Sequence, residues 1–346
     1  MFSHKSLFQA ITKGDIESCR LLMEELDKEP VSDKNYELLQ IRKKTGNIRR
    51  KYTDTVLLEI LEQLFRYGVS PNEKNNNNSH PLSALYSVMR YKPGICKAAT
   101  KLFVKYGLRI RDLRPMYSAI NYALPVAVKE LLNAGYDPDI VRKGSRYLLN
   151  ADYVPFLCSA VSKLSICRLN CFSQTAAATD TLQILLDSGA DPNIEDKYGQ
   201  TPLFYCGESD TAELLLGYGA DVNYYVPDSS ACTPLHQAIE IQRYELAQFL
   251  VHNGAKLEVR NNKGATPFLS YMRYNSWASD EEKIPPNKVQ FALFLVEHGA
   301  DIYAKDSQGW SIFDINSTLI AHIKELYEHV QLTYRVQDAD MSDFVR

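Results

Sequence analysis

Motifs that bind phosphate groups or metal ions are missing from this 346-residue sequence. It has no G-x-x-x-x-G-K-[ST] loop, no G-x-G-x-x-G after a strand, and no H-E-x-x-H or C-x-x-C pair. Each of those patterns places several ligand atoms within reach of one phosphate or metal ion. Cys167 and Cys171 come closest to a metal pair, but no second pair lies near them in the sequence. We therefore expect neither a metal ion nor a cofactor.

Long apolar runs and a surplus of positive charge are missing as well. No stretch approaches the roughly 18 uninterrupted apolar residues of a membrane-spanning helix, so we expect no membrane insertion. The N-terminus lacks the charged-then-apolar run of a secretory signal. A formal net charge of −3 makes nucleic acid an unexpected main partner, because phosphate neutralisation requires a basic surplus. The seven cysteines are odd in number and scattered, which favours reduced thiols in a cytosol.

What is present is a phrase that recurs along the chain. It consists of apolar residues, two spacers, glycine, a small residue, aspartate and a polar residue. The clear copies occupy 185–193, 215–223, 249–255 and 295–301, and degenerate copies occupy 64–72, 103–107 and 131–139. A second phrase, Thr-Pro followed by an apolar residue, lies between the copies at 201–204, 233–238 and 266–268.

Each part of these phrases has a structural meaning. Threonine before proline opens a helix, because the hydroxyl caps free N–H groups and proline fits the first helical position. The apolar residues form the buried stripe of a second helix, and the glycine after them ends it in a left-handed conformation. Aspartate and asparagine then shape a turn. The repeated unit is therefore a helix, a turn, a second helix and a projecting loop.

These phrases resemble the ankyrin repeat, which carries Thr-Pro-Leu-His-x-Ala and Gly-Ala-Asp-x-Asn at a period of about 33 residues. The resemblance is specific over 182–311 and looser from 57 to 139, and residues 7–22 resemble the helix pair of a starting repeat. It implies an all-α solenoid of about eight or nine helix-turn-helix repeats, several of them degenerate or carrying insertions. His236, the histidine of the motif, is implied to belong to the hydrogen-bond network that opens its helix.

Spacing divides the chain into four expected segments. Residues 1–55 form an N-terminal capping repeat with a basic insertion, and 56–153 form degenerate repeats. Residues 154–311 form well-matched repeats with insertions at 163–179 and 275–288, and 312–346 form a C-terminal capping helix and an acidic tail. The repeat from Thr201 to Gly219 is about three residues short of the family's period, so we expect its first helix to lose most of a turn.

The resemblance also implies where a partner binds, namely at the loop tips and on the exposed face of each first helix. The loop tips are expected at Lys197, Tyr198, Tyr224 and Tyr225, and further along at Asn262, Lys263, Ser307 and Gln308. The first-helix positions are expected at Tyr205, Gln237, Glu240, Ile241, Tyr244, Ser270, Arg273 and Tyr274. Trp277, in the insertion at 275–288, is added as an anchor. Tyrosine and tryptophan are enriched in binding hot spots.

We interpret the chain as a non-enzymatic protein–protein interaction module, expected to be a monomer. It resembles ankyrin effectors that intracellular bacteria secrete, which would place it in a host cytosol as an adaptor or decoy for a host protein. The alternative is an enzyme, such as a cysteine-dependent hydrolase, whose site is built from the insertions. A thiol beside a histidine in an open cleft would favour that alternative. A third hypothesis is an oligomerising structural protein.

Overall fold

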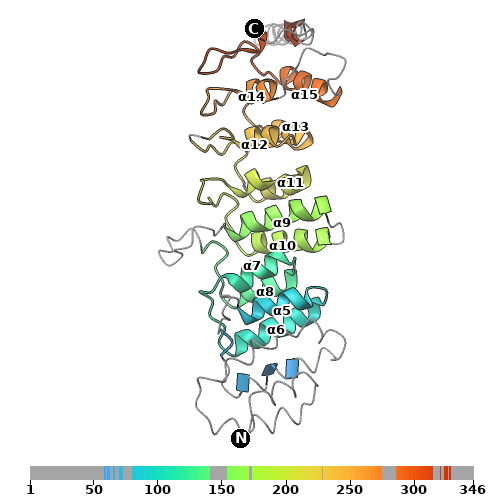
Figure 1. Ribbon diagram of the computed structural model, residues 1–346, viewed down its shortest axis with the longest axis vertical. Coiled ribbons are helices and arrows are strands. Elements are labelled where there is room, and N and C mark those ends of the chain that lie inside the picture. The colour runs from blue at the N-terminus through green and yellow to red at the C-terminus, as the bar shows by residue number, and fades with distance from the viewer. Residues whose placement is uncertain are drawn as a thin grey trace, which may run out of the picture. The chain divides into compact units, whose positions relative to one another are not determined.

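A computed structural model describes residues 80–140, 154–170, 174–227, 229–274 and 286–314, with single positions between 58 and 72 and between 320 and 328. All regular structure within these ranges is helical, as Figure 1 shows. The chain divides into two compact units, Met1–Asp191 and Pro192–Arg346. The division falls inside the segment 154–311 that the sequence treats as continuous.

The described residues of the first unit from 81 to 187 form three consecutive helix pairs. Its described helices are α5 (Pro81–Met89), α6 (Pro93–Lys105), α7 (Arg114–Asn121), α8 (Pro125–Asn133), α9 (Phe156–Asn170) and α10 (Thr175–Asp187). The first helices α5, α7 and α9 pack on one another in series, and the second helices α6, α8 and α10 do the same. Each pair therefore repeats the arrangement of the pair before it.

The second unit continues the same design within its described residues. Its elements are the 3-10 turn η2 (Pro202–Tyr205), α11 (Ser209–Gly217), α12 (Pro234–Glu240), α13 (Tyr244–His252), α14 (Pro267–Tyr274), α15 (Pro286–Glu297) and the 3-10 turn η4 (Ile312–Asp314). One series runs through η2, α12, α14 and η4, and the other through α11, α13 and α15. The predicted all-α stack of helix-turn-helix repeats is confirmed.

The helices begin and end where the repeated phrases predict. Thr233 Oγ1 accepts a hydrogen bond from the His236 N–H at 3.3 Å, and Pro234 is the first residue of α12. Gly254 follows the end of α13 with a φ of 88°. The next N–H, of Ala255, donates to the Leu250 carbonyl at 2.9 Å. This left-handed ending satisfies carbonyls that the helix leaves free.

The irregular repeats lie where the sequence predicts them, but not all of their extra residues form loops. The short repeat has a single 3-10 turn, η2, in place of its first helix, as predicted. The extra residues at 163–179 differ from a loop, because 163–170 continue α9 and 175–179 lie in α10. Residues 286–288 of the insertion at 275–288 begin α15. The segment 27–55, Trp277 and the acidic tail lie outside the described residues.

Candidate functional site

Three loops of the second unit share one hydrogen-bond design, and we call them the hairpin edge: residues 196–200, 261–265 and 306–310. Each opens on a buried residue, namely Asp196, Asn261 and Asp306. In each loop the first residue's N–H donates to the carbonyl of the last, at 2.9 to 3.0 Å. The Oδ1 atom of the first residue also accepts the N–H groups two and four positions later, at 2.8 to 3.0 Å. Each loop is therefore closed by its own side chain.

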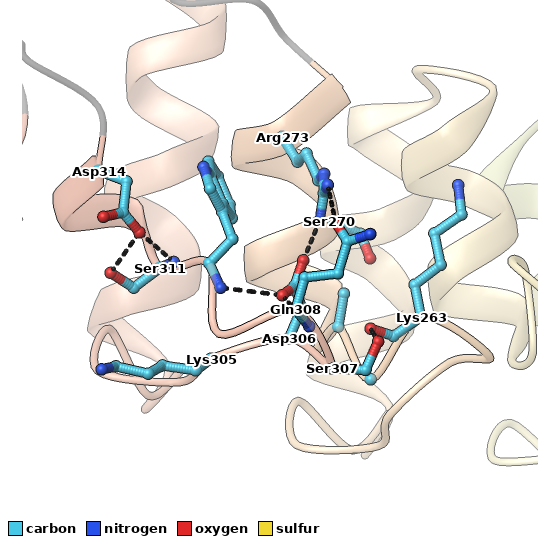
Figure 2. Close-up of polar contacts among 12 residues, drawn as sticks. Lys263, Ser270, Arg273, Lys305, Asp306, Ser307, Gln308, Ser311 and Asp314 are labelled. Carbon is cyan, nitrogen blue, oxygen red and sulfur yellow. Dashed lines mark hydrogen bonds and ion pairs between the residues drawn. The ribbon is translucent and has the colours of Figure 1, made fainter.

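In each of these loops, the buried first residue binds a side chain from a first helix through a hydrogen bond or an ion pair. The Tyr205 hydroxyl donates to Asp196, and the Asn261 amide donates to Ser270 Oγ at 3.2 Å. Asp306 forms an ion pair with Arg273, shown in Figure 2. The other amino group of the Arg273 guanidinium donates to the Gln308 side chain at 2.9 Å.

Neighbouring loops of the hairpin edge are also joined to one another. The Ser307 N–H and hydroxyl both donate to the Lys263 carbonyl, at 2.9 and 2.8 Å. The Arg260 guanidinium donates to the carbonyls of Gly264 and Lys305, at 2.7 and 2.6 Å. These bonds fix the relative positions of two successive loops.

The loop tips carry several of the predicted partner-binding residues. Lys197 and Tyr198 are exposed at the first tip; Tyr198 is 66% exposed, and the centre of its ring lies 5.0 Å from Lys197 Nζ. The predicted tip residues Asn262, Lys263, Ser307 and Gln308 are exposed as well. Their placement at tips agrees with the repeat pattern.

Tyr224 and Tyr225 do not lie at a tip, and that part of the prediction is wrong. The loop that follows them is closed by a bond from the Val226 N–H to the Cys232 carbonyl at 2.8 Å, so the two tyrosines precede it. The loop 226–232 begins seven residues after Gly219, just as 196–200 begins seven residues after Gly189, whereas the two tyrosines lie only five and six residues after the glycine. Tyr225 is 50% exposed, and the Tyr224 hydroxyl donates to Glu195.

The first-helix predictions divide into exposed residues and packing residues. Gln237 and Glu240 lie on α12, and Ile241, which follows α12, is 44% exposed. Tyr205 and Arg273 point to the loops that they hold. The side chain of Tyr274 lies outside the described residues.

The prediction that Tyr244 lies on a first helix is wrong, because Tyr244 is the first residue of the second helix α13. Its ring stacks on Phe291 at 4.9 Å and meets the Tyr271 ring edge-on at 5.5 Å. The first helix α12 ends at Glu240, and Gln242, with a left-handed φ of 59°, lies between it and Tyr244. The aromatic ring is therefore used in packing between repeats.

One function of the Gly-Ala-Asp-x-Asn phrase was missed by sequence reasoning, namely that its asparagine joins one repeat to the next. Asn193 donates to the Gly219 carbonyl at 2.9 Å and accepts the Asp221 N–H at 2.7 Å. Asn223 makes the same two bonds to Gly254 and Lys256, at 2.9 and 2.8 Å. The regular recurrence of asparagine four residues after the glycine was the available signal.

The equivalent position after Gly254 is Glu258, which supplies only half of this link. Glu258 accepts the Asp301 N–H at 2.9 Å. Burial raises the pKa of its carboxyl group. An ionised carboxylate has no donor for a carbonyl of the next repeat.

We expect Glu258→Asn to stabilise the chain by about 1 kcal/mol, measured as a higher urea midpoint, because the amide supplies the absent donor. The reverse change, Asn223→Asp, should lower the midpoint by a similar amount, and equal midpoints for all three proteins would contradict this reading.

A cysteine and a histidine do meet in the second unit, but not in an open cleft. Cys232 Sγ lies 3.6 Å from His236 Nδ1, and both residues are buried. Burial raises the pKa of the Cys232 thiol to about 11 and lowers the pKa of His236 to about 4. Both groups are therefore neutral near pH 7, whereas nucleophilic cysteines need the thiolate. The pair gives the enzyme alternative no support.

His236 instead completes the opening of α12, as the motif resemblance implies. Its Nδ1 lies 2.9 Å from Thr233 Oγ1, and its Nε2 lies 3.3 Å from the carbonyl oxygen of Ala265. The carbonyl can only accept, so Nε2 carries the proton and Nδ1 accepts from the threonine hydroxyl. The ring thus ties α12 to a loop of the hairpin edge.

The described residues show little else that would indicate a catalytic or metal-binding site. A solvent-open cavity of about 440 Å³ lies beside the short repeat, and its lining, which includes Glu208, Arg243, Tyr244 and Phe291, holds no cysteine or histidine. Among the positions that the structure describes, no three histidine, cysteine, aspartate or glutamate side chains come together as a metal site. None of the described helices combines the length and apolarity needed to cross a bilayer.

Comparisons with known proteins agree with the repeat design. A family model for three copies of the ankyrin repeat matches residues 172–261. Human rabankyrin-5 is 32% identical over 152 residues, which is 42% of this chain but 12% of rabankyrin-5. The crystal structure of the ankyrin repeat domain of Bcl-3 covers 66% of this chain and 92% of its own, at 21% identity and a TM-score of 0.49.

Some relatives are matched over most of their own length. The cyclin-dependent kinase 4 inhibitor B of Rattus norvegicus is 35% identical over 98 residues, which is 27% of this chain and 75% of the inhibitor. Together with the family model and the paired helices, this match shows what the chain is. It belongs to the family of ankyrin-repeat proteins.

Proposed function

We propose that the chain binds another protein through the hairpin edge and the exposed first-helix residues of its second unit. Repeat proteins stack their units so that each contributes a small part of one extended binding surface. The observation that carries the proposal is the bracing of the loops. Asp196, Asn261 and Asp306 hold the loops from within, while the tip side chains are exposed.

Bracing matters because ordering a loop during association consumes binding free energy. Immobilising rotamer-rich side chains and loops is among the main costs of forming an interface. The loop at 306–310 is tied to its own Asp306, to Arg273 and to the Lys263 carbonyl of the preceding loop. Its tip is therefore ordered before any partner arrives.

The exposed side chains also suit a protein interface. The exposed Tyr198 and Ile241 offer apolar area, and the exposed Glu240 and the half-buried Gln237 offer polar groups. Interfaces commonly combine a few aromatic or aliphatic anchors with a polar rim. The predicted binding residues that remain on this surface are Lys197, Tyr198, Gln237, Glu240 and Ile241.

Photo-crosslinking tests this surface. We would place a photoreactive phenylalanine analogue at Tyr198, at Gln237 or at Tyr91, which is 62% exposed in the first unit, and irradiate each full-length variant in eukaryotic cytosol. We expect positions 198 and 237 to form adducts with one and the same polypeptide and position 91 to form none with it. Adducts of that polypeptide at position 91 alone would contradict the proposed surface.

A narrower proposal concerns where the chain works. We propose that it acts as a secreted effector in a host cytosol, as a monomer that serves as adaptor or decoy for a host protein. The support is compositional: the asparagine run Asn75–Asn78, 22 tyrosines and an acidic C-terminal sequence. The crosslinking described above tests it too. A host polypeptide captured at positions 198 and 237 is the expected result, and adducts found in bacterial but never in eukaryotic cytosol would contradict it.

A further inference from the structure

We propose that His252 and His298 form a binding site for a divalent transition-metal ion of the zinc type, which would bridge two neighbouring repeats. His252 is the last residue of α13, and His298 immediately follows α15, which packs on α13 (Figure 1). The two histidines lie far apart in the sequence and form no short motif, so the sequence alone predicts no metal ion there. The site belongs to the second helices and does not depend on the proposed function.

The two imidazole rings lie at the distance that a shared metal ion requires. Their centres are 5.1 Å apart, and their planes are nearly perpendicular, at 88°. A tetrahedral zinc ion bound about 2.1 Å from one nitrogen of each ring holds the ring centres about 5 Å apart. Turning an imidazole about its Cβ–Cγ bond leaves the centre of the ring almost in place. A nitrogen of the exposed His252 can therefore be directed at the ion without moving either helix.

The hydrogen bond of the His298 ring leaves one of its nitrogens prepared for a metal ion. Nδ1 lies 2.8 Å from the carbonyl oxygen of Phe294. Because a carbonyl oxygen only accepts, Nδ1 carries the proton, and Nε2 of the neutral ring keeps its lone pair. Histidines that bind metal ions commonly donate their other ring N–H to a backbone carbonyl, which fixes the orientation of the ring.

The side chain of Phe294 contacts both imidazoles and places them side by side. The centre of its ring lies 4.0 Å from that of His298 and 5.3 Å from that of His252. Both histidines are nevertheless exposed, so an ion can reach them from solvent. Because the rings are already close together, binding of an ion costs less conformational entropy than gathering two free side chains would.

The position of the pair at two helix ends favours a cation over an anion. The C-terminus of a helix carries a partial negative charge, and here α13 and α15 end beside the same two rings. A phosphate or carboxylate ligand would be repelled by these helix ends. Imidazole nitrogen suits zinc, copper and nickel, whereas calcium and magnesium prefer oxygen ligands.

Two imidazoles fill only part of the coordination sphere of such an ion. Among the residues that the structure describes, no third histidine, cysteine, aspartate or glutamate joins a group that could hold a metal ion. Water would complete the coordination, unlike in structural zinc sites, where four protein ligands surround the ion. We therefore expect a site that exchanges its ion with solvent.

Isothermal titration of the full-length chain with Zn²⁺ tests this inference. We expect a tightest binding event that His252→Gln and His298→Gln each weaken by at least about tenfold, since even the outer-shell partners of a ligating histidine are worth about 10–100-fold. The matched control, His4→Gln, removes an imidazole from the first unit and should bind like the unaltered chain. Zn²⁺ should also raise the urea midpoint of the unaltered chain and of the control, but not that of the two site variants.

Nitrogen-15 NMR of the imidazoles checks the assigned atoms without any substitution. Zn²⁺ should shift the Nε2 resonance of His298 while Nδ1 keeps its proton, and it should shift a ring nitrogen of His252 at the same zinc concentration. A response from only one of the two histidines would overturn the inference. Equal affinity for Zn²⁺ in the unaltered chain and in a double variant lacking both imidazoles would overturn it as well, as would equal weakening by the His4 control.

Discussion

Replacing Gly264 by alanine is expected to destabilise the second unit by about 4 kcal/mol, as the sum of two effects. Gly264 has a φ of 72°, a conformation in which a side chain is strained by about 1–2 kcal/mol. A Cβ atom there would also lie 2.8 Å from the backbone nitrogen of Ser307. That nitrogen donates to the Lys263 carbonyl, so the clash cannot be relieved by rotating a side chain. The loop 306–310 would have to move away from its neighbour.

The glycine that ends α13 provides the matched control. Gly254 has a similar φ of 88°, but an added Cβ would meet no atom within 4 Å. Gly254→Ala should therefore lose only the conformational part, about 1–2 kcal/mol. Urea unfolding of both variants, with hydrogen exchange of the loops 261–265 and 306–310, measures the difference. Equal losses in the two variants would show that the contact with Ser307 is unimportant.

Acid is expected to destabilise the chain through His236 by about 3 kcal/mol in total. Burial lowers the pKa of His236 from an ordinary value of 6.5 to about 4. Above pH 6.5 the ring is neutral in both folded and unfolded chains, so its stabilising bonds are fully present. As the pH falls from 6.5 toward 4, the unfolded chain takes up a proton that the folded chain excludes. Stability is lost through this window, and the loss levels off below pH 4.

His236→Gln isolates this effect from the titration of the carboxyl groups. The variant should be less stable than the original chain at pH 7, because Thr233 and the Ala265 carbonyl lose their partner. The gap between the two unfolding free energies should then shrink steadily between pH 6.5 and pH 4. Parallel pH profiles for the two proteins would contradict the buried, neutral histidine.

The helices of the best-matched repeats could be predicted closely because their signals are local. Thr233 and Pro234 open α12, and Gly254 ends α13 by its own conformation. The segment 163–179 could not be predicted in the same way. Its residues carry no proline or glycine that would break a helix, and the period alone does not say whether extra residues form a loop or lengthen α9 and α10.

The candidate site could be predicted better at the loop tips than at the helical residues that contact the loops. The glycines at 199, 264 and 309 follow the tip residues, which fixed Tyr198 and Lys263 correctly. Tyr244 was misplaced because α12 ends at Glu240, a boundary that depends on the left-handed Gln242. The bonds of Arg273 to Asp306 and of Tyr205 to Asp196 depend on tertiary contacts that spacing does not encode.

The asparagine links have a consequence for how the second unit would respond to a pulling force. Asn193 and Asn223 each bind the following repeat through two hydrogen bonds of similar geometry. A repeat peeled away from one end would break its own pair of bonds and leave the next pair intact. Stretching in an optical trap should accordingly lengthen this part of the chain in steps of one repeat. The first rupture should fall at the connection made by Glu258, which has one bond where the others have two.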